Sequence, residues 1–166
     1  KGKGGFLHGT TRDDKHYPEI YWQQLAQQLA GRGFRVRMVW GSEAEQDRAK
    51  RIARSVPSVE VLPRLNIQGV AGVLAQANAV VAVDTGLGHL TAALGIPAVS
   101  LYGPTLPGLI GAYGDNQVHL CAKDFPAQPQ GEEQLIEPAV FAPLTPAAVL
   151  EYLDKQLSVG REKAVC

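Results

Sequence analysis

The sequence has little of several residue types that mark specialised classes of protein. Its two cysteines, Cys121 and Cys166, are too few for a disulfide framework or a zinc site, and they fit a cytosolic setting. The 16 Lys and Arg residues balance the 16 Asp and Glu residues, which leaves no electrostatic signature of nucleic-acid binding. No signal peptide opens the chain. We therefore expect a globular protein without a nucleic-acid partner.

Several nucleotide-binding motifs are also missing. No G-x-G-x-x-G follows the first expected strand and no Walker A lysine is present, which argues against an NAD-binding fingerprint or a P-loop. No Asp-x-Asp pair is evident, so the chemistry does not require a metal, and we expect no cofactor. The chain begins Lys-Gly-Lys-Gly-Gly rather than with Met, directly before an expected strand. That start favours a domain of a larger protein.

The apolar pattern predicts alternating strands and helices. At 166 residues and 45% apolar content the chain is long enough for one domain with a substantial core. Expected strands lie at residues 6–8, 35–40, 59–62, 79–83, 98–102 and 118–122, and expected helices at 18–31, 42–54, 66–77, 86–94 and 145–157. The third helix should turn Ile67, Val70, Val73, Leu74 and Ala77 inward. This order predicts a Rossmann-like α/β three-layer sandwich with a parallel sheet of about six strands.

Two connections lack regular periodicity. Residues 105–117 are rich in Gly and Pro and are too long for a simple turn, so we expect a functional loop. Residues 123–144 contain four prolines and are expected to form an irregular connection before the last helix.

The stretch from Ala79 to Thr105 organises the rest of the chain. A buried strand ends in the polar turn Asp84-Thr85-Gly86, and a helix and a second apolar strand follow. No Asp, Glu, Lys or Arg occurs from Thr85 to Gly114, and the glycines and prolines there argue against a membrane span and for a sheet centre covered on both faces. Ligands bind at the carboxyl edge of such sheets, where helix N-termini present free N–H groups to anions. The same turn would also serve as a simple helix cap.

Several motifs, in order, closely resemble those of one enzyme family. They lie at residues 10–16 (TTRDDKH), 40–41 (WG), 83–87 (VDTGL), 89–94 (HLTAAL), 102–105 (YGPT) and 107–111 (PGLIG). From Phe6 to Cys121 the chain resembles the lipopolysaccharide heptosyltransferases of type I, in glycosyltransferase family nine. The D-T-G-L-x-H-L-T motif favours type I over type II. Tyr17 and Gly88 depart from the family, which often has Trp and Ser there.

The resemblance implies a glycosyltransferase built of two Rossmann-like domains, the GT-B architecture. Such an enzyme transfers L-glycero-D-manno-heptose from ADP-heptose to the Kdo sugar of the lipid A-linked inner core, by an inverting displacement. The resemblance implies that residues 1–166 are the single carboxyl-terminal, donor-binding domain, without the amino-terminal domain that binds the acceptor and supplies the catalytic base. It also implies a place at the cytoplasmic face of the inner membrane of a Gram-negative bacterium, with peripheral membrane association of the full protein.

The resemblance also implies a donor site. Its expected ADP-heptose-binding residues are Thr10, Thr11, Lys15, Glu45, Leu65, Asp84, Thr85, Gly86 and His89. On their residue types alone, Lys15, Thr10 and Thr11 suit the leaving diphosphate, and Thr85-Gly86 suits a phosphate at a helix start. The family places Asp84 on the heptose, Glu45 on the ribose hydroxyls and Leu65 against the adenine. His89 suits a phosphate oxygen or the sugar.

Each of these residues also has a structural explanation. Ser42 and Glu45 form a helix capping box, His89 is compatible with a buried core position, and the turn at residues 10–15 is compatible with a solvated loop. Other functions remain open as well: heptosyltransferase II, an epimerase-like sugar-nucleotide domain, or a nucleotide-binding module without catalysis. A bare module would bind ADP with little gain from the heptose.

Overall fold

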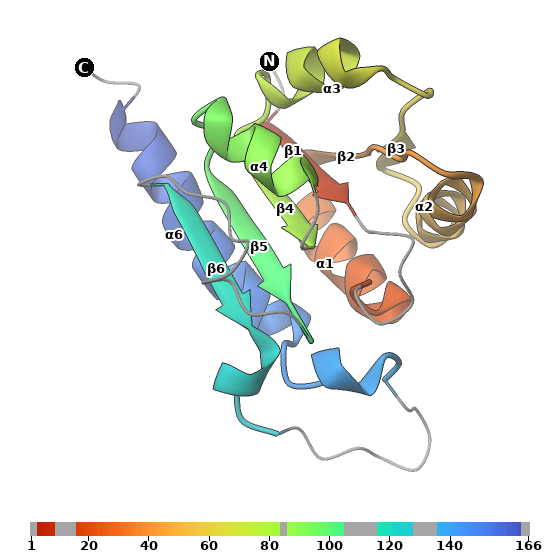
Figure 1. The fold of residues 1–166 in the computed structure, drawn as a ribbon, viewed down its shortest axis with the longest axis vertical. Helices are drawn as coiled ribbons and strands as arrows, with labels where there is room; N and C mark the ends of the chain where they lie inside the picture. Colours follow the sequence, from red (N-terminus) through yellow and green to blue (C-terminus); the bar gives the residue numbers. More distant parts are fainter. Residues whose placement is uncertain (1–2, 9–15, 84–85, 105–115, 128–135, 164–166) are drawn as a thin grey trace.

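The chain folds around one six-stranded parallel sheet (Figure 1). The computed structural model describes residues 3–8, 16–83, 86–104, 116–127 and 136–163, with the backbone alone for 3–8 and 159–163. Its strands are β1 (Lys3–His8), β2 (Phe34–Met38), β3 (Val59–Val61), β4 (Ala79–Val83), β5 (Ala98–Tyr102) and β6 (Gln117–Cys121). Every neighbouring pair is parallel and the spatial order is β3-β2-β1-β4-β5-β6. This confirms the predicted Rossmann-like class.

Helices cover both faces of the sheet. The helices are α1 (Glu19–Gly31), α2 (Glu43–Ser55), α3 (Ile67–Leu74), α4 (Gly86–Ala93) and α6 (Pro146–Lys163). One core cluster joins α1, α2 and α6 to one face, and a smaller one joins α3 and α4 to the other. Val81 and Val83 of β4 enter the first cluster while Val80 and Ala82 enter the second, as the alternation of side chains along a strand requires. The continuous apolar runs of β4 and β5 follow from burial on both faces.

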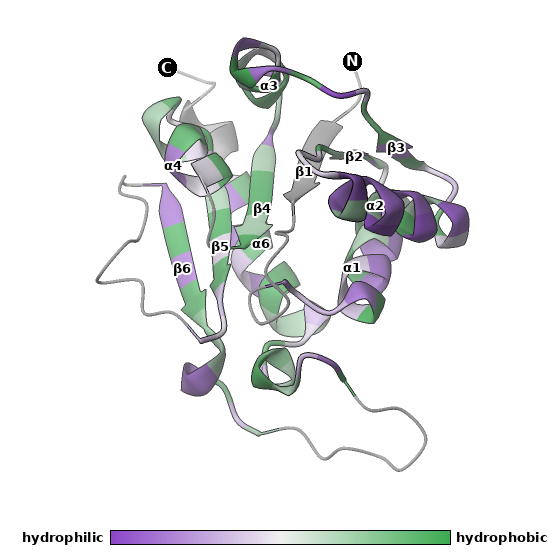
Figure 2. Ribbon diagram, turned by 45° about the vertical axis from the view of Figure 1, so that its right-hand side comes forward, coloured by the Kyte–Doolittle hydropathy of each residue, from purple (hydrophilic) through white to green (hydrophobic). Residues whose placement is uncertain are grey.

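Local sequence signals set the helix starts. Ser42 and Glu45 form the expected capping box of α2, which buries only Ala49 and Ile52 and is mainly hydrophilic (Figure 2). The side chain of Asn66 caps α3 by accepting from the backbone N–H of Gly69 at 2.8 Å. One expectation for α3 is wrong: Ile67 is 73% exposed rather than inward. The same face of α3 carries Val70 and the fully buried Leu74. Ile67 lies in the first turn, which extends beyond the residues that cover the rest of this face.

The proline-rich connection is tied to the start of α1. It contains two 3-10 turns, Ala122–Asp124 and Ala139–Phe141. The hydroxyl of Tyr17 donates to the carbonyl oxygen of Leu144 at 2.7 Å, and that of Tyr21 donates to the carbonyl oxygen of Ala142 at 2.8 Å. The Tyr17 ring also meets the buried Phe141 ring edge-on, with centroids 5.7 Å apart. The final turns of this connection therefore belong to the core.

A close approach at the end of β5 adds to this anchor. A Cβ atom at Gly103 would lie 2.9 Å from two ring carbons of Phe141. Because Phe141 is fully buried, its ring has no free space into which to move. Glycine at position 103 thus lets the end of β5 pack directly on the connection.

Candidate functional site

The direction of the strand order reverses between β1 and β4. These strands are neighbours in the sheet, with Leu7 in register with Val81. The chain leaves β1 for α1 on one face and leaves β4 for α4 on the opposite face. In open parallel sheets such a reversal opens a crevice outside the carboxyl ends of the strands, and ligands bind there.

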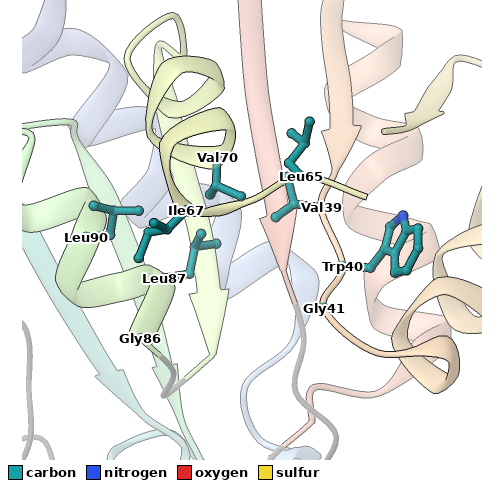
Figure 3. Close-up of a pocket in the computed structure, with 9 residues that line it drawn as sticks. All are labelled: Val39, Trp40, Gly41, Leu65, Ile67, Val70, Gly86, Leu87 and Leu90. Carbon is teal, nitrogen blue, oxygen red and sulfur yellow. The ribbon is translucent and has the colours of Figure 1, made fainter. Parts of the chain in front are cut away.

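A largely apolar cavity of about 280 Å³ lies at this edge (Figure 3). It is lined by residues after β2, by the connection and first turn at α3, and by the start of α4: Val39, Trp40, Gly41, Leu65, Ile67, Val70, Gly86, Leu87 and Leu90. Whole ligands occupy pockets of roughly 300–1,000 Å³. The described residues that line it carry no charge, so a cavity of this size suits one apolar part of a ligand, such as a nucleobase.

Gly86 joins the cavity to the start of α4. It is the first residue of the helix, it is exposed, and a Cβ atom placed on it would meet nothing within 4 Å. The first N–H groups of a helix lack partners inside the helix and attract anions. The space over Gly86 therefore allows a phosphate group to approach the helix end directly.

Glu45 lies beside the cavity, and one of its two carboxylate oxygens already accepts hydrogen bonds. Its Oε2 accepts from the backbone N–H of Gly41 at 2.6 Å and from that of Ser42 at 3.3 Å. Its other oxygen, Oε1, makes no hydrogen bond to any residue that the structure describes. The capping role is therefore real, and it leaves one carboxylate oxygen available to a ligand hydroxyl group.

Leu65 and Trp40 are held in place by local contacts. A Cβ atom at Gly69 would lie 3.3 Å from that of Leu65, so the side chain of Leu65 rests on the first turn of α3. The indole N–H of Trp40 donates to the carbonyl oxygen of Leu62 at 2.7 Å, which fixes the ring across the ends of β2 and β3. Leu65 lines the cavity.

The remaining expected site residues fall into two groups. His89 is exposed on α4, which removes the alternative of a buried core histidine. It is not part of the cavity lining. Thr10, Thr11, Lys15, Asp84 and Thr85 lie outside the described residues, directly after β1 and β4. Four of the nine expected residues are thus placed, at Glu45, Leu65, Gly86 and His89.

Sequence reasoning missed most of the cavity wall. Val39, Val70, Leu87 and Leu90 line it together with Ile67, yet in the sequence each reads as an ordinary core position. They could have been found from their position near the carboxyl ends of β2 and β4. That inference requires the strand order, which shows that these two strands flank β1.

Comparison with known proteins fixes the family. Residues 1–140 match glycosyltransferase family 9 (heptosyltransferase). The chain belongs to this family. The resemblance seen in the motifs is confirmed by this match.

Relatives in the family are close in sequence and in fold. Lipopolysaccharide heptosyltransferase 1 of Pseudomonas aeruginosa is 48% identical over 168 residues, which cover 92% of this chain and 47% of that protein. The structure of Escherichia coli heptosyltransferase WaaC with ADP has a TM-score of 0.78 and 46% identity, and covers 93% of this chain and 44% of that one. WaaC with ADP-2-deoxy-2-fluoro heptose gives 0.74 and 43%, covering 93% and 43%. The chain therefore spans less than half the length of these relatives.

Three further properties of the described residues bear on chemistry. Among the described residues, no group of three or more His, Cys, Asp or Glu side chains is placed to hold a metal ion. Within the same residues, no helix has the length and apolar character needed to cross a membrane. The buried thiol of Cys121 has a raised pKa, chiefly because burial disfavours the thiolate, so it stays protonated at neutral pH.

Proposed function

We propose that this chain is the donor-binding domain of a heptosyltransferase that transfers L-glycero-D-manno-heptose from ADP-heptose to Kdo of the lipid A-linked inner core. The observation that carries the proposal is the apolar cavity beside the open start of α4, at the reversal point of the sheet. Support comes from the similar WaaC structures, one with ADP and one with ADP-2-deoxy-2-fluoro heptose. The name heptosyltransferase 1 of the P. aeruginosa relative supports type I over type II.

In this proposal each part of the donor has its own partner. The adenine enters the cavity against Leu65, and the free oxygen of Glu45 accepts from a ribose hydroxyl. The diphosphate lies at the start of α4, over Thr85 and Gly86, because the helix N-terminus carries unpaired N–H donors. Asp84 accepts from heptose hydroxyls, since a carboxylate at the end of a buried strand needs donors. The exposed His89 reaches a phosphate oxygen or the sugar.

The chemical step is an inverting displacement at the anomeric carbon. The acceptor hydroxyl oxygen forms the new bond to this carbon while the bond to the diphosphate oxygen breaks, and ADP leaves. Lys15, the hydroxyls of Thr10 and Thr11, and the end of α4 stabilise the negative charge that develops on the diphosphate. A general base takes the proton of the acceptor hydroxyl. The resemblance assigns that base to the amino-terminal half of the family's enzymes.

In this proposal the part of such an enzyme outside this chain binds the acceptor and associates with the membrane. Kdo–lipid A is a membrane lipid, so an enzyme that modifies it works at a membrane surface. We place this activity at the cytoplasmic face of the inner membrane of a Gram-negative bacterium, by peripheral association of the full protein. In this proposal the chain contributes the donor site, and no nucleic acid or cofactor takes part.

Titration calorimetry tests the donor assignment on the 166-residue chain itself. ADP and ADP-heptose should bind, and each should bind more tightly than UDP and a UDP-sugar. A gain in affinity from ADP to ADP-heptose separates a transferase donor site from a bare nucleotide-binding module. Equal, negligible binding of all four ligands would refute the assignment.

A further inference from the structure

Ile67 is a large apolar side chain whose exposure the fold does not explain. It is 73% exposed, although it lies on the same face of α3 as the half-buried Val70 and the fully buried Leu74. The first turn of a helix favours Pro or acidic residues, and an exposed aliphatic side chain adds nothing to its stability. The burial along this face therefore decreases towards the end of the helix that borders the cavity.

The neighbours of Ile67 show what occupies the space beside it. In Figure 3, Ile67 lies with Leu87 and Leu90 on one side of the cavity, and Leu65 lies with Val39 on the other. The capping bond from Gly69 to Asn66 fixes the turn between Leu65 and Ile67. The other lining residues on both sides include buried and half-buried positions, whereas Ile67 keeps most of its surface in water.

We infer that Ile67 is a donor-binding residue that covers one face of the donor's nucleobase. This inference rests on the donor site proposed above and adds a residue that the sequence had assigned to the core. A flat, uncharged ring between Ile67 and Leu65 would remove the exposed surface of Ile67 from water. The cost of leaving an aliphatic side chain exposed in the free chain is offset when the base binds.

Because Ile67 is exposed, its substitution should change binding without changing the stability of the fold. Surface substitutions away from core contacts change stability by less than about 0.5 kcal/mol. Ile67→Ser should therefore leave the melting temperature unchanged while it removes apolar contact with the base. The matched control is Leu94→Ser, because Leu94 follows α4, is 39% exposed and does not line the cavity. Ile67→Leu restores an aliphatic side chain of the same size.

Titration of ADP into these chains at several temperatures tests the inference. Ile67→Ser should weaken ADP binding about tenfold, equivalent to ~1.4 kcal/mol. It should also make the heat-capacity change of binding less negative, because less apolar surface is buried. Ile67→Leu and Leu94→Ser should bind ADP as the unchanged chain does.

Two failures can be told apart. If the unchanged chain binds no ADP, the proposed donor function is refuted, and this inference with it. If the unchanged chain binds ADP while Ile67→Ser retains both its affinity and its heat-capacity change, the inference alone is overturned. A loss of affinity with an unaltered heat-capacity change would also overturn it, because Ile67 would then act without contacting the base.

Discussion

At the scale of single residues, Glu45 combines a structural role with a proposed binding role. Its Oε2 accepts two backbone N–H bonds at the start of α2, and its Oε1 is free of hydrogen bonds to the described residues. A capping box accepts Glu or Gln at this position, because both supply a carboxyl or amide oxygen to the backbone donor. The two roles of Glu45 can therefore be separated by substitution.

Glu45→Gln should keep the fold and weaken ADP binding. The amide has one oxygen, which stays with the cap, so an NH2 group takes the place of Oε1 and cannot accept a hydrogen bond from the ribose hydroxyl. A hydrogen bond to a charged group contributes about 1.5–3 kcal/mol, whereas a neutral bond donated by the NH2 group to the hydroxyl oxygen contributes about 0.5–1.5 kcal/mol, so a loss of affinity of roughly five- to twelvefold is expected. Calorimetry gives the affinity and a thermal melt gives the stability.

Glu45→Ala is the control for the capping role. It removes the acceptor for Gly41 and Ser42, so its melting temperature should fall together with its ADP affinity. If Glu45→Gln binds ADP as tightly as the unchanged chain, the carboxylate serves the helix start alone.

At the scale of elements, the final turns of the proline-rich connection before α6 pack into the core. Tyr17 and Tyr21 from the start of α1 donate to two of its carbonyl oxygens, and Phe141 packs against both Tyr17 and Gly103. Burial raises the pKa of Tyr17 well above its ordinary value of 10.0, with a smaller contribution from Tyr21, and burial also raises the pKa of Tyr21. Both phenols stay protonated in the folded chain, as hydrogen-bond donors must.

The raised pKa values predict a loss of stability at alkaline pH. The unfolded tyrosines ionise near pH 10 while the folded ones do not, so their contribution is complete below pH 10 and decreases as the pH rises through the folded pKa. Each such group lowers the free energy of unfolding by about 1.4 kcal/mol per pH unit in this range. Tyr17→Phe should therefore show a shallower decline above pH 10 in denaturant titrations.

The stabilities of the unchanged chain and Tyr17→Phe should also be compared at neutral pH. There Tyr17→Phe should lose about 1–3 kcal/mol of stability, because the buried carbonyl group of Leu144 loses its donor. The Cys121 thiol, whose pKa is also raised, is common to both chains and cancels in the difference. An identical pH dependence of the two chains would contradict the role assigned to the Tyr17 hydroxyl.

The element pattern was predictable because it depends on local composition. The runs at β4 and β5 are continuously apolar, and Ser42 and Asn66 are strong helix caps, so the sequence alone located these elements. The exposure of Ile67 was not predictable. Helical periodicity identifies the apolar face of α3, but it does not say where the neighbouring layer ends.

The site itself was predictable only in part. The motif residues follow strands and resemble a known family, so Glu45, Leu65 and Gly86 could be named in advance. The cavity wall depends on β1 lying between β2 and β4, which places Val39 opposite Leu87. Strand order is a property of long-range pairing, and a single sequence does not contain it in any local signal.

At the scale of the whole molecule, the sheet reversal brings residues far apart in the chain to one cavity, where we propose the donor site. The carboxylates that we assign to it, Asp84 and Glu45, have donor-side roles: the heptose for Asp84, and the ribose and the α2 cap for Glu45. An inverting displacement also needs a base within hydrogen-bond reach of the acceptor hydroxyl. Holding donor and acceptor together contributes up to ~7–11 kcal/mol to such a reaction, which requires partners on both sides of the reacting atoms.

We therefore expect the 166-residue chain to bind the donor without transferring heptose. The test incubates it with ADP-heptose and Kdo–lipid A and measures heptosylated product by mass spectrometry. A full-length heptosyltransferase 1, about twice as long as this chain, is the positive control under the same conditions. Calorimetry on the same sample confirms that the donor site is occupied, so that a lack of product reports on catalysis rather than on binding. Product formed at a rate comparable to that of the full-length enzyme would show that these residues hold both the base and the acceptor site.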